Sequence, residues 1–156
     1  MCAFVGATSS EPGITVSRAD FYQLKSNDPA SRYPLLCRLL EKCIGAGQQV
    51  YIVCSSEAEA LHLDHYIWAF KPDSFIPHNC THEGAKATVI LGHPAIPSTA
   101  QPDHREICIN LSQQLAPENF DRIIELVVQD DQMLQTARAH YAKYSQLGHA
   151  MQYHKI

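Results

Sequence analysis

Residues 49–70 read QVYIVCSSEAEALHLDHYIWAF and contain the signal that decides the fold class. The first six are rich in β-branched and aromatic residues, which favours a buried strand. Ser56 and Glu59 are then spaced as a capping box, in which a hydroxyl and a carboxylate accept hydrogen bonds from backbone N–H groups of the first helical turn. The segment therefore predicts a strand over 49–54 and, directly after it, a helix that ends near Phe70.

The rest of the chain alternates in the same way, which is typical of a layered α/β domain. Further helices are predicted at 34–44 and from Asp130 or Asp131 to about Leu147, further strands at 20–24, 87–91, 106–111 and 120–128, and an ordered loop over 71–86. We expect a single three-layer, Rossmann-like α/β domain over 15–156, with a mixed, largely parallel sheet flanked by helices. Residues 1–14 are expected to form a flexible N-terminal extension.

The composition is that of a globular protein, with 46% apolar and 18% charged residues. The apolar stretches all fall well short of the roughly 20 residues that span a bilayer. The apolar patch at the start has no positive residue before it, as a secretory signal would require. Six cysteines scattered through apolar segments indicate buried, reduced thiols. These features predict a cytoplasmic protein with no membrane segment.

The net charge of −4 argues against direct DNA binding, because the footprint of a DNA-binding protein is normally strongly basic. The charge is unevenly distributed, however. No acidic residue follows Asp131, whereas Arg138, Lys143 and Lys155 all do. The C-terminal end is therefore locally cationic, although solvated helix ends often carry such charge by chance. Direct binding of single-stranded DNA stays a disfavoured alternative.

Patterns typical of an enzyme are weak in this chain. The turn Cys54-Ser55-Ser56 has neither a glycine-rich phosphate fingerprint nor a GxxxxGK[ST] loop, and no GxSxG context surrounds its serines. Residues 78–82, HNCTH, place three potential zinc ligands within five positions, but structural zinc sites use separated pairs of ligands. A small α/β enzyme with a metal or small-molecule site at His78–His82 remains the alternative from another functional class.

Trp68 occupies an unusual position on its predicted helix. At 100° per residue, Leu63, Ile67 and Phe70 form one apolar stripe, and Trp68 lies about 160° from Phe70. A Trp off the core face, followed by Phe75-Ile76-Pro77, indicates an apolar patch for a protein partner. The alternative is that the following loop folds back and covers the indole.

The last predicted helix carries a second candidate site. Leu134, Arg138 and Tyr141 lie within a stripe of about 60° on one helix face. A guanidinium beside an aromatic ring suits a carboxylate with an apolar neighbour. The alternative is a Tyr packed into the core with the stem of the Arg side chain lying over it.

Several segments together resemble the chi subunits of bacterial DNA polymerase III. Trp68, followed by SFIPHN at 74–79, matches the pattern Trp, six residues, Phe-x-Pro-His-Asn. The flanking segments agree in order and spacing: DFYQL at 20–24, VYIVCSSEAEALHLD at 50–64, EICINLS at 106–112 and ARAHYAKYSQLG at 137–148. The similarity covers nearly everything after residue 15.

The resemblance implies a non-catalytic replisome adaptor that needs no cofactor and meets DNA only indirectly. Such a subunit joins the psi subunit, and through it the clamp loader, while a second site holds the acidic, Phe-ended C-terminal tail of single-stranded DNA-binding protein. Carried over to matching positions, the psi surface, which a helicase also uses, would comprise Trp68, Phe75 and Pro77, and the tail site would comprise Leu134, Arg138 and Tyr141.

This chain departs from the family pattern at the tail site. The pattern has a Lys where this chain has Leu134, and another where it has Ala142. Lys143 is present but points about 140° away from Arg138 on the helix. Because each exposed charge contributes a few tenths to about 1 kcal/mol, we expect weaker tail binding, or help from His140 or His149.

Overall fold

The structure is a computed structural model that describes residues 17–70, 78–80, 88–96, 101–102 and 104–156. Its elements are β1 (Arg18–Gln23), the short 3-10 helix η1 (Pro29–Ser31), α1 (Arg32–Gly45), β2 (Val50–Val53), α2 (Glu57–Ala69), β3 (His78–Cys80), β4 (Val89–Gly92), β5 (Ile107–Asn110), β6 (Arg122–Val127), α3 (Asp131–Gln146) and β7 (Ala150–Lys155). The extension predicted for residues 1–14 lies outside the described residues.

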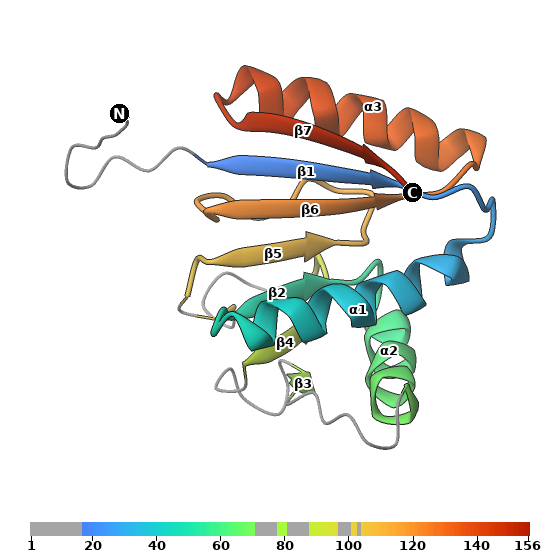
Figure 1. The fold of residues 1–156 in the computed structure, drawn as a ribbon, viewed down its shortest axis with the longest axis vertical. Coiled ribbons are helices and arrows are strands. Elements are labelled where there is room, and N and C mark those ends of the chain that lie inside the picture. Colours follow the sequence, from blue (N-terminus) through green and yellow to red (C-terminus); the bar gives the residue numbers. More distant parts are fainter. Residues whose placement is uncertain (1–16, 71–77, 81–87, 97–100, 103) are drawn as a thin grey trace.

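The strands of the described residues form one seven-stranded sheet in the order β3-β4-β2-β5-β6-β1-β7. The predicted α/β class is confirmed. The sheet is more regular than expected, since all the paired strands in the described part run parallel. Parallel neighbours need crossover connections, and a helix lies in the connection between β1 and β2, between β2 and β3 and between β6 and β7, whereas residues 111–121 join β5 to β6 without a helix. Figure 1 shows α3 running along β7 and β1, while α1 and α2 lie beside the half of the sheet that contains β2 and β4.

The two faces of the sheet carry separate hydrophobic cores because strand side chains alternate between faces. On β2, Val50 and Ile52 face the core that includes buried residues of α1 and α2. Tyr51 and Val53 face the core that includes Tyr144 of α3. The helices α2 and α3 therefore pack on opposite faces of the sheet.

Cys37, Cys43 and Cys108 are free thiols and, like Cys54, are buried, as expected. Burial raises the pKa of the Cys37 thiol to about 12, so this thiol stays protonated at neutral pH. None of the helices in the described residues combines the length and the apolar character that a bilayer span requires.

The predicted capping box begins α2. The Ser56 hydroxyl accepts a hydrogen bond from the backbone N–H of Glu59 at 3.2 Å. In return, Glu59 Oε1 accepts from the backbone N–H of Ser55 at 2.6 Å, and its other carboxylate oxygen accepts from the Tyr33 hydroxyl at 2.8 Å. Nucleotide-binding α/β proteins often place a phosphate at such a helix start. Here the Ser56 hydroxyl binds the N–H group of Glu59 in the first turn, and the Glu59 carboxylate binds the N–H group of Ser55 just before the helix.

Two strands and the 3-10 helix were not predicted from the sequence. The loop prediction for 71–86 is wrong at β3, where pairing with β4 supplies hydrogen bonds that local propensity does not reveal. β7 begins just after Gly148, whose φ of 92° suits glycine and lets the chain reverse after α3. Its register with β1 places Tyr153 opposite Phe21. This pairing has a direct consequence for the candidate site.

Gly92, at the end of β4, lies against the buried ring of Tyr51. A Cβ at this position would lie 2.8 Å from Cε1 of Tyr51 and still closer to its hydroxyl oxygen. Tyr51 is only 1% exposed and its ring stacks on that of Phe120, so a shift of the ring would disturb the core. We expect Gly92→Ala to lower the free energy of unfolding by about 1–3 kcal/mol in urea denaturation. Gly45→Ala, where nothing lies within 4 Å, is the control, and equal effects of the two changes would contradict this account.

Candidate functional site

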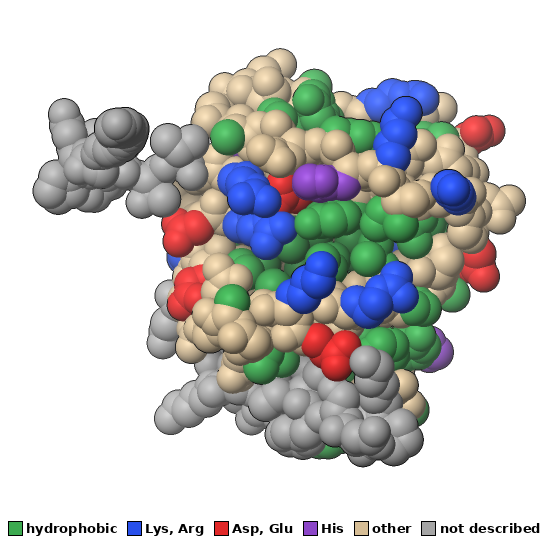
Figure 2. All heavy atoms as spheres, viewed as in Figure 1, with side chains coloured by type: hydrophobic (Ala, Val, Ile, Leu, Met, Phe, Trp, Pro, Cys, Tyr) green, Lys and Arg blue, Asp and Glu red, His purple; other side chains and the backbone are tan. Residues whose placement is uncertain are grey.

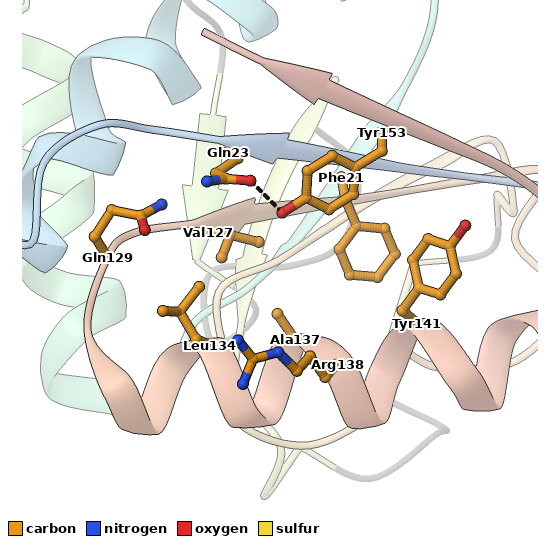
Figure 3. Close-up of a pocket in the computed structure, with 9 residues that line it drawn as sticks. All are labelled: Phe21, Gln23, Val127, Gln129, Leu134, Ala137, Arg138, Tyr141 and Tyr153. Atoms are coloured by element: carbon orange, nitrogen blue, oxygen red, sulfur yellow. Dashed lines mark hydrogen bonds between the residues drawn. The ribbon is translucent and has the colours of Figure 1, made fainter.

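A pocket of about 450 Å³ lies between α3 and the part of the sheet formed by β1, β6 and β7 (Figure 3). Its lining residues come from all four elements and the turn before α3: Phe21, Gln23, Val127, Gln129, Leu134, Ala137, Arg138, Tyr141 and Tyr153. The three residues that the sequence singled out on the last helix thus lie together in one pocket. The strand residues opposite them were not predicted as part of the site.

The position of α3 follows from its local sequence. Asp130 caps the helix by accepting a hydrogen bond from the backbone N–H of Met133 at 3.1 Å. With the helix start fixed there, Leu134, Arg138 and Tyr141 fall at positions i, i+4 and i+7 and face the sheet edge together. The predicted common face is therefore present.

The pocket has an aromatic floor. Phe21 is 1% exposed, and its ring centroid lies 5.3 Å from that of Tyr141 and 6.3 Å from that of Tyr153, with which it is stacked. The Tyr153 hydroxyl donates a hydrogen bond to the side-chain oxygen of Gln23 (Figure 3). Tyr141 and Tyr153 remain 39% and 47% exposed. Tyr141 therefore packs on the core and still presents a face to the pocket.

Arg138 supplies the cation at the pocket wall. Its side chain is exposed and points along α3 toward Leu134 (Figure 3). Within the described part of the chain, no acidic side chain forms an ion pair with it. An exposed guanidinium beside an apolar hollow can donate two parallel hydrogen bonds to a carboxylate. The pocket is thus suited to a ligand that combines an aromatic or aliphatic group with an anion.

The two histidines proposed to replace the missing lysines do not lie at this pocket. His140 is buried, with its Nδ1 3.0 Å from a Glu125 carboxylate oxygen and its Nε2 3.0 Å from the Gln113 carbonyl oxygen. His149 lines a separate hollow at the other end of α3, together with Lys143. That part of the expectation is wrong because the helix turns His140 toward the sheet and His149 lies beyond the helix end.

A buried polar cluster around Glu125 fixes α3 on the sheet. One oxygen of the Glu125 carboxylate accepts hydrogen bonds from the Tyr144 hydroxyl at 2.7 Å and from the Asn110 amide at 2.9 Å, and it also lies 3.0 Å from His140 Nδ1. Both nitrogens of His140 face acceptors, an arrangement that favours the doubly protonated imidazolium, which donates to both. Burial lowers the pKa of His140, but the hydrogen bond and charge of Glu125 outweigh it, and the pKa is raised.

The opposite face of β1 carries a different set of charges. Asp20 is fully buried, and its carboxylate lies 3.0 Å from Arg18 Nε and 2.6 Å from Arg122 Nε. Burial raises the pKa of Asp20, but these two hydrogen bonds and charges outweigh it and lower the pKa. Figure 2 shows Lys and Arg side chains gathered around a hydrophobic area on the molecular face that carries α1. Unlike Arg138, the two arginines beside Asp20 are already paired.

The second candidate surface lies on α2. Trp68 is 54% exposed, whereas Ala60, Leu63 and Ile67 form the buried side of the helix, as the helical spacing indicates. Leu61, seven residues before Trp68 and on the same helix face, is 44% exposed. Leu61 was not predicted from the sequence as part of this surface. Phe75 and Pro77 lie outside the described residues.

The alternative metal site cannot be built from the described residues. The side chains of 78–82 lie outside what the structure describes. Elsewhere in the described ranges, no three His, Cys, Asp or Glu side chains are grouped so that they could hold a metal ion.

A family model described as "DNA polymerase III chi subunit, HolC" matches residues 16–152 of the chain. The chain belongs to this chi subunit family. Three curated proteins named "DNA polymerase III subunit chi" are similar to it. The one from Pseudomonas aeruginosa is 39% identical, over 90% of this chain and 98% of the relative. The one from Haemophilus influenzae is 30% identical over 79% and 86%, and the one from Escherichia coli is 31% identical over 73% and 78%.

Membership of the chi family confirms the resemblance seen in the sequence motifs. It makes the chain an accessory subunit of the DNA polymerase III holoenzyme, with a role in DNA replication. The pocket beside α3 and the exposed Trp68 are therefore surfaces of a replication subunit.

Proposed function

We propose that this chi-family chain is a non-catalytic adaptor that connects the clamp loader, through the psi subunit, to the C-terminal tail of single-stranded DNA-binding protein. The pocket between α3 and the β1–β7 edge is the observation that carries the proposal. It combines an aromatic floor at Phe21 with the exposed guanidinium of Arg138. An acidic peptide that ends in Phe offers the complementary groups.

In this proposal the terminal Phe ring of the tail enters the pocket between Leu134 and Tyr153, above Phe21. Burying such a ring stabilises the complex by about 1.5–3 kcal/mol. The terminal carboxylate meets Arg138 in a charge-assisted hydrogen bond, which contributes about 1.5–3 kcal/mol. Association and ordering of the tail offset part of this gain, so we expect an affinity in the micromolar range.

An adaptor must hold two partners at once, and the arrangement of the helices supports this. The helix α2, which bears Trp68 and Leu61, packs on one face of the sheet, and α3 packs on the other. Exposed Trp side chains are enriched at interface centres. We assign the psi contact, and a competing helicase contact, to this α2 surface together with Phe75 and Pro77.

Replacing Trp68 with alanine is expected to weaken psi binding about tenfold, because truncating an interface Trp commonly costs more than 1 kcal/mol. Co-purification of tagged psi with the folded variant measures the loss. Arg138→Ala is the matched control. This variant should retain psi, since Arg138 and Trp68 lie on opposite faces of the sheet. Unchanged psi recovery with Trp68→Ala would remove α2 from the interface.

The bridging role is tested with three components. Single-stranded DNA-binding protein is immobilised, and psi from the same source is added with or without this chain. We expect psi to be retained only when the chain is present, and to be lost when the immobilised protein lacks its terminal Phe. Retention of psi without the chain, or equal capture by the truncated protein, would refute the adaptor proposal.

A further inference from the structure

The pocket beside α3 continues into a second hollow. Gln23 and Gln129 line both, and Figure 3 places them at the end of the pocket near the start of α3, with Tyr141 at the other end. The second hollow has a volume of about 300 Å³ and lies at the carboxyl ends of β1 and β7. Its lining consists of Gln23, Leu24, Lys25, Gln129, Lys155 and Ile156.

The strand register fixes where Lys155 stands, and Lys25 lies just beyond the end of β1. Lys155 lies opposite Gln23 in the pairing of β7 with β1, and it follows Tyr153 by two residues. It is therefore on the same sheet face as the Tyr153 ring, about 7 Å farther along the strand. Lys25 follows Gln23 by two residues. Both lysines are exposed, and neither forms an ion pair within the described part of the chain.

The pocket and the second hollow together form one channel. The two lysines lie at the end of this channel where α3 lacks a cation. Leu134, which replaces a Lys of the family pattern, belongs to the first turn of α3 and lines the pocket beside Gln129. The nearby carboxylate of Asp130 is bonded to the backbone of the same turn, which compensates its charge in part. Positive charge therefore reaches this end of the channel from the strand side instead of the helix side.

We propose that Lys25 and Lys155 bind the acidic residues that precede the terminal Phe of the tail. The inference rests on the proposed function, and it adds a second subsite to the same channel. The Phe ring and its carboxylate occupy the pocket at Arg138, and the preceding residues run along the carboxyl ends of β1 and β7. Lys155 of β7 and Lys25, just after β1, thereby supply the positive charge that a lysine at position 134 would bring to this end of the channel.

The test measures by calorimetry how tightly the wild type and a double lysine variant bind two peptides. One copies the acidic, Phe-ended tail, and the other has its acidic residues replaced by the corresponding amides but keeps the terminal Phe. We expect Lys25→Gln combined with Lys155→Gln to weaken binding of the acidic peptide about 3- to 10-fold, as two exposed charge pairs would. The amide peptide should bind the wild type and the double variant equally, and added salt should reduce the difference for the acidic peptide.

The control variant is Arg38→Gln combined with Lys42→Gln, two exposed cations on α1 on the other face of the sheet, and it should bind both peptides like the wild type. If the wild type binds the acidic peptide and the Lys25/Lys155 variant binds it equally well, this inference is overturned while the proposed function stands. If the folded wild type binds neither peptide, the proposed function fails.

Discussion

Replacing Glu125 with alanine is expected to lower the free energy of unfolding by about 3–5 kcal/mol, the largest effect that we predict for this chain. The carboxylate is 5% exposed and accepts from the Tyr144 hydroxyl and the Asn110 amide while pairing with His140. Its removal leaves the buried Tyr144 hydroxyl and His140 Nδ1 without this acceptor, while the Asn110 amide keeps only its hydrogen bond to the Gln114 carbonyl oxygen. Urea denaturation followed by circular dichroism measures the loss.

The controls separate the charge of Glu125 from its shape. Glu125→Gln keeps the volume and one acceptor oxygen, so it should cost less than Glu125→Ala. Glu118→Ala removes an exposed carboxylate and should change stability by about 0.5 kcal/mol or less. A loss for Glu125→Ala as small as the one for Glu118→Ala would show that the buried cluster does not hold α3 on the sheet.

The same cluster makes the effect of Glu125→Gln depend on pH. The pKa of His140 is raised in the folded chain, so its contribution to stability is fully present below the ordinary histidine value of about 6.5. That contribution is lost as the pH rises through the raised pKa. The destabilisation by Glu125→Gln should therefore be largest near pH 6 and shrink above that range. A destabilisation that grows with pH would contradict the imidazolium assignment.

Replacing Arg138 with alanine is expected to weaken binding of the Phe-ended tail peptide about 10- to 100-fold, because a charge-assisted hydrogen bond to a carboxylate contributes about 1.5–3 kcal/mol. The side chain is exposed, so the variant should unfold at the same urea concentration as the wild type. Lys143→Ala is the matched control. It removes a cation from the same helix, but on the side that lines another hollow. Equal losses for the two variants would indicate general electrostatic attraction instead of a site at Arg138.

Local sequence patterns predict the elements that carry the candidate surfaces. The capping residues Ser56 and Asp130 fix where α2 and α3 begin, and helical periodicity then decides which side chains share a face. The exposure of Trp68 and the common face of Arg138 and Tyr141 follow from those two facts alone. The family resemblance depends on such local motifs too.

Local sequence patterns do not predict the contacts between distant segments that complete the candidate site. Phe21 and Tyr153 are more than a hundred residues apart and meet only because β7 adds to β1 in parallel. The segment 150–155 is short and half polar, so its strand identity depends on the pairing with β1 and not on its own propensity. The lysine at position 155 gains its place beside the pocket in the same way. The wrong expectation for His140 also has this origin, because its partner Glu125 lies on β6.

The most direct test of the adaptor account is a calorimetric titration of the wild-type chain with a peptide copying the acidic tail, alongside the same peptide without its terminal Phe. We predict saturable micromolar binding of one intact peptide per chain, and no measurable binding of the shortened one. Equal binding of both peptides, or no binding of the intact peptide to the folded chain, would contradict the claim that the pocket between α3 and the β1–β7 edge holds the tail.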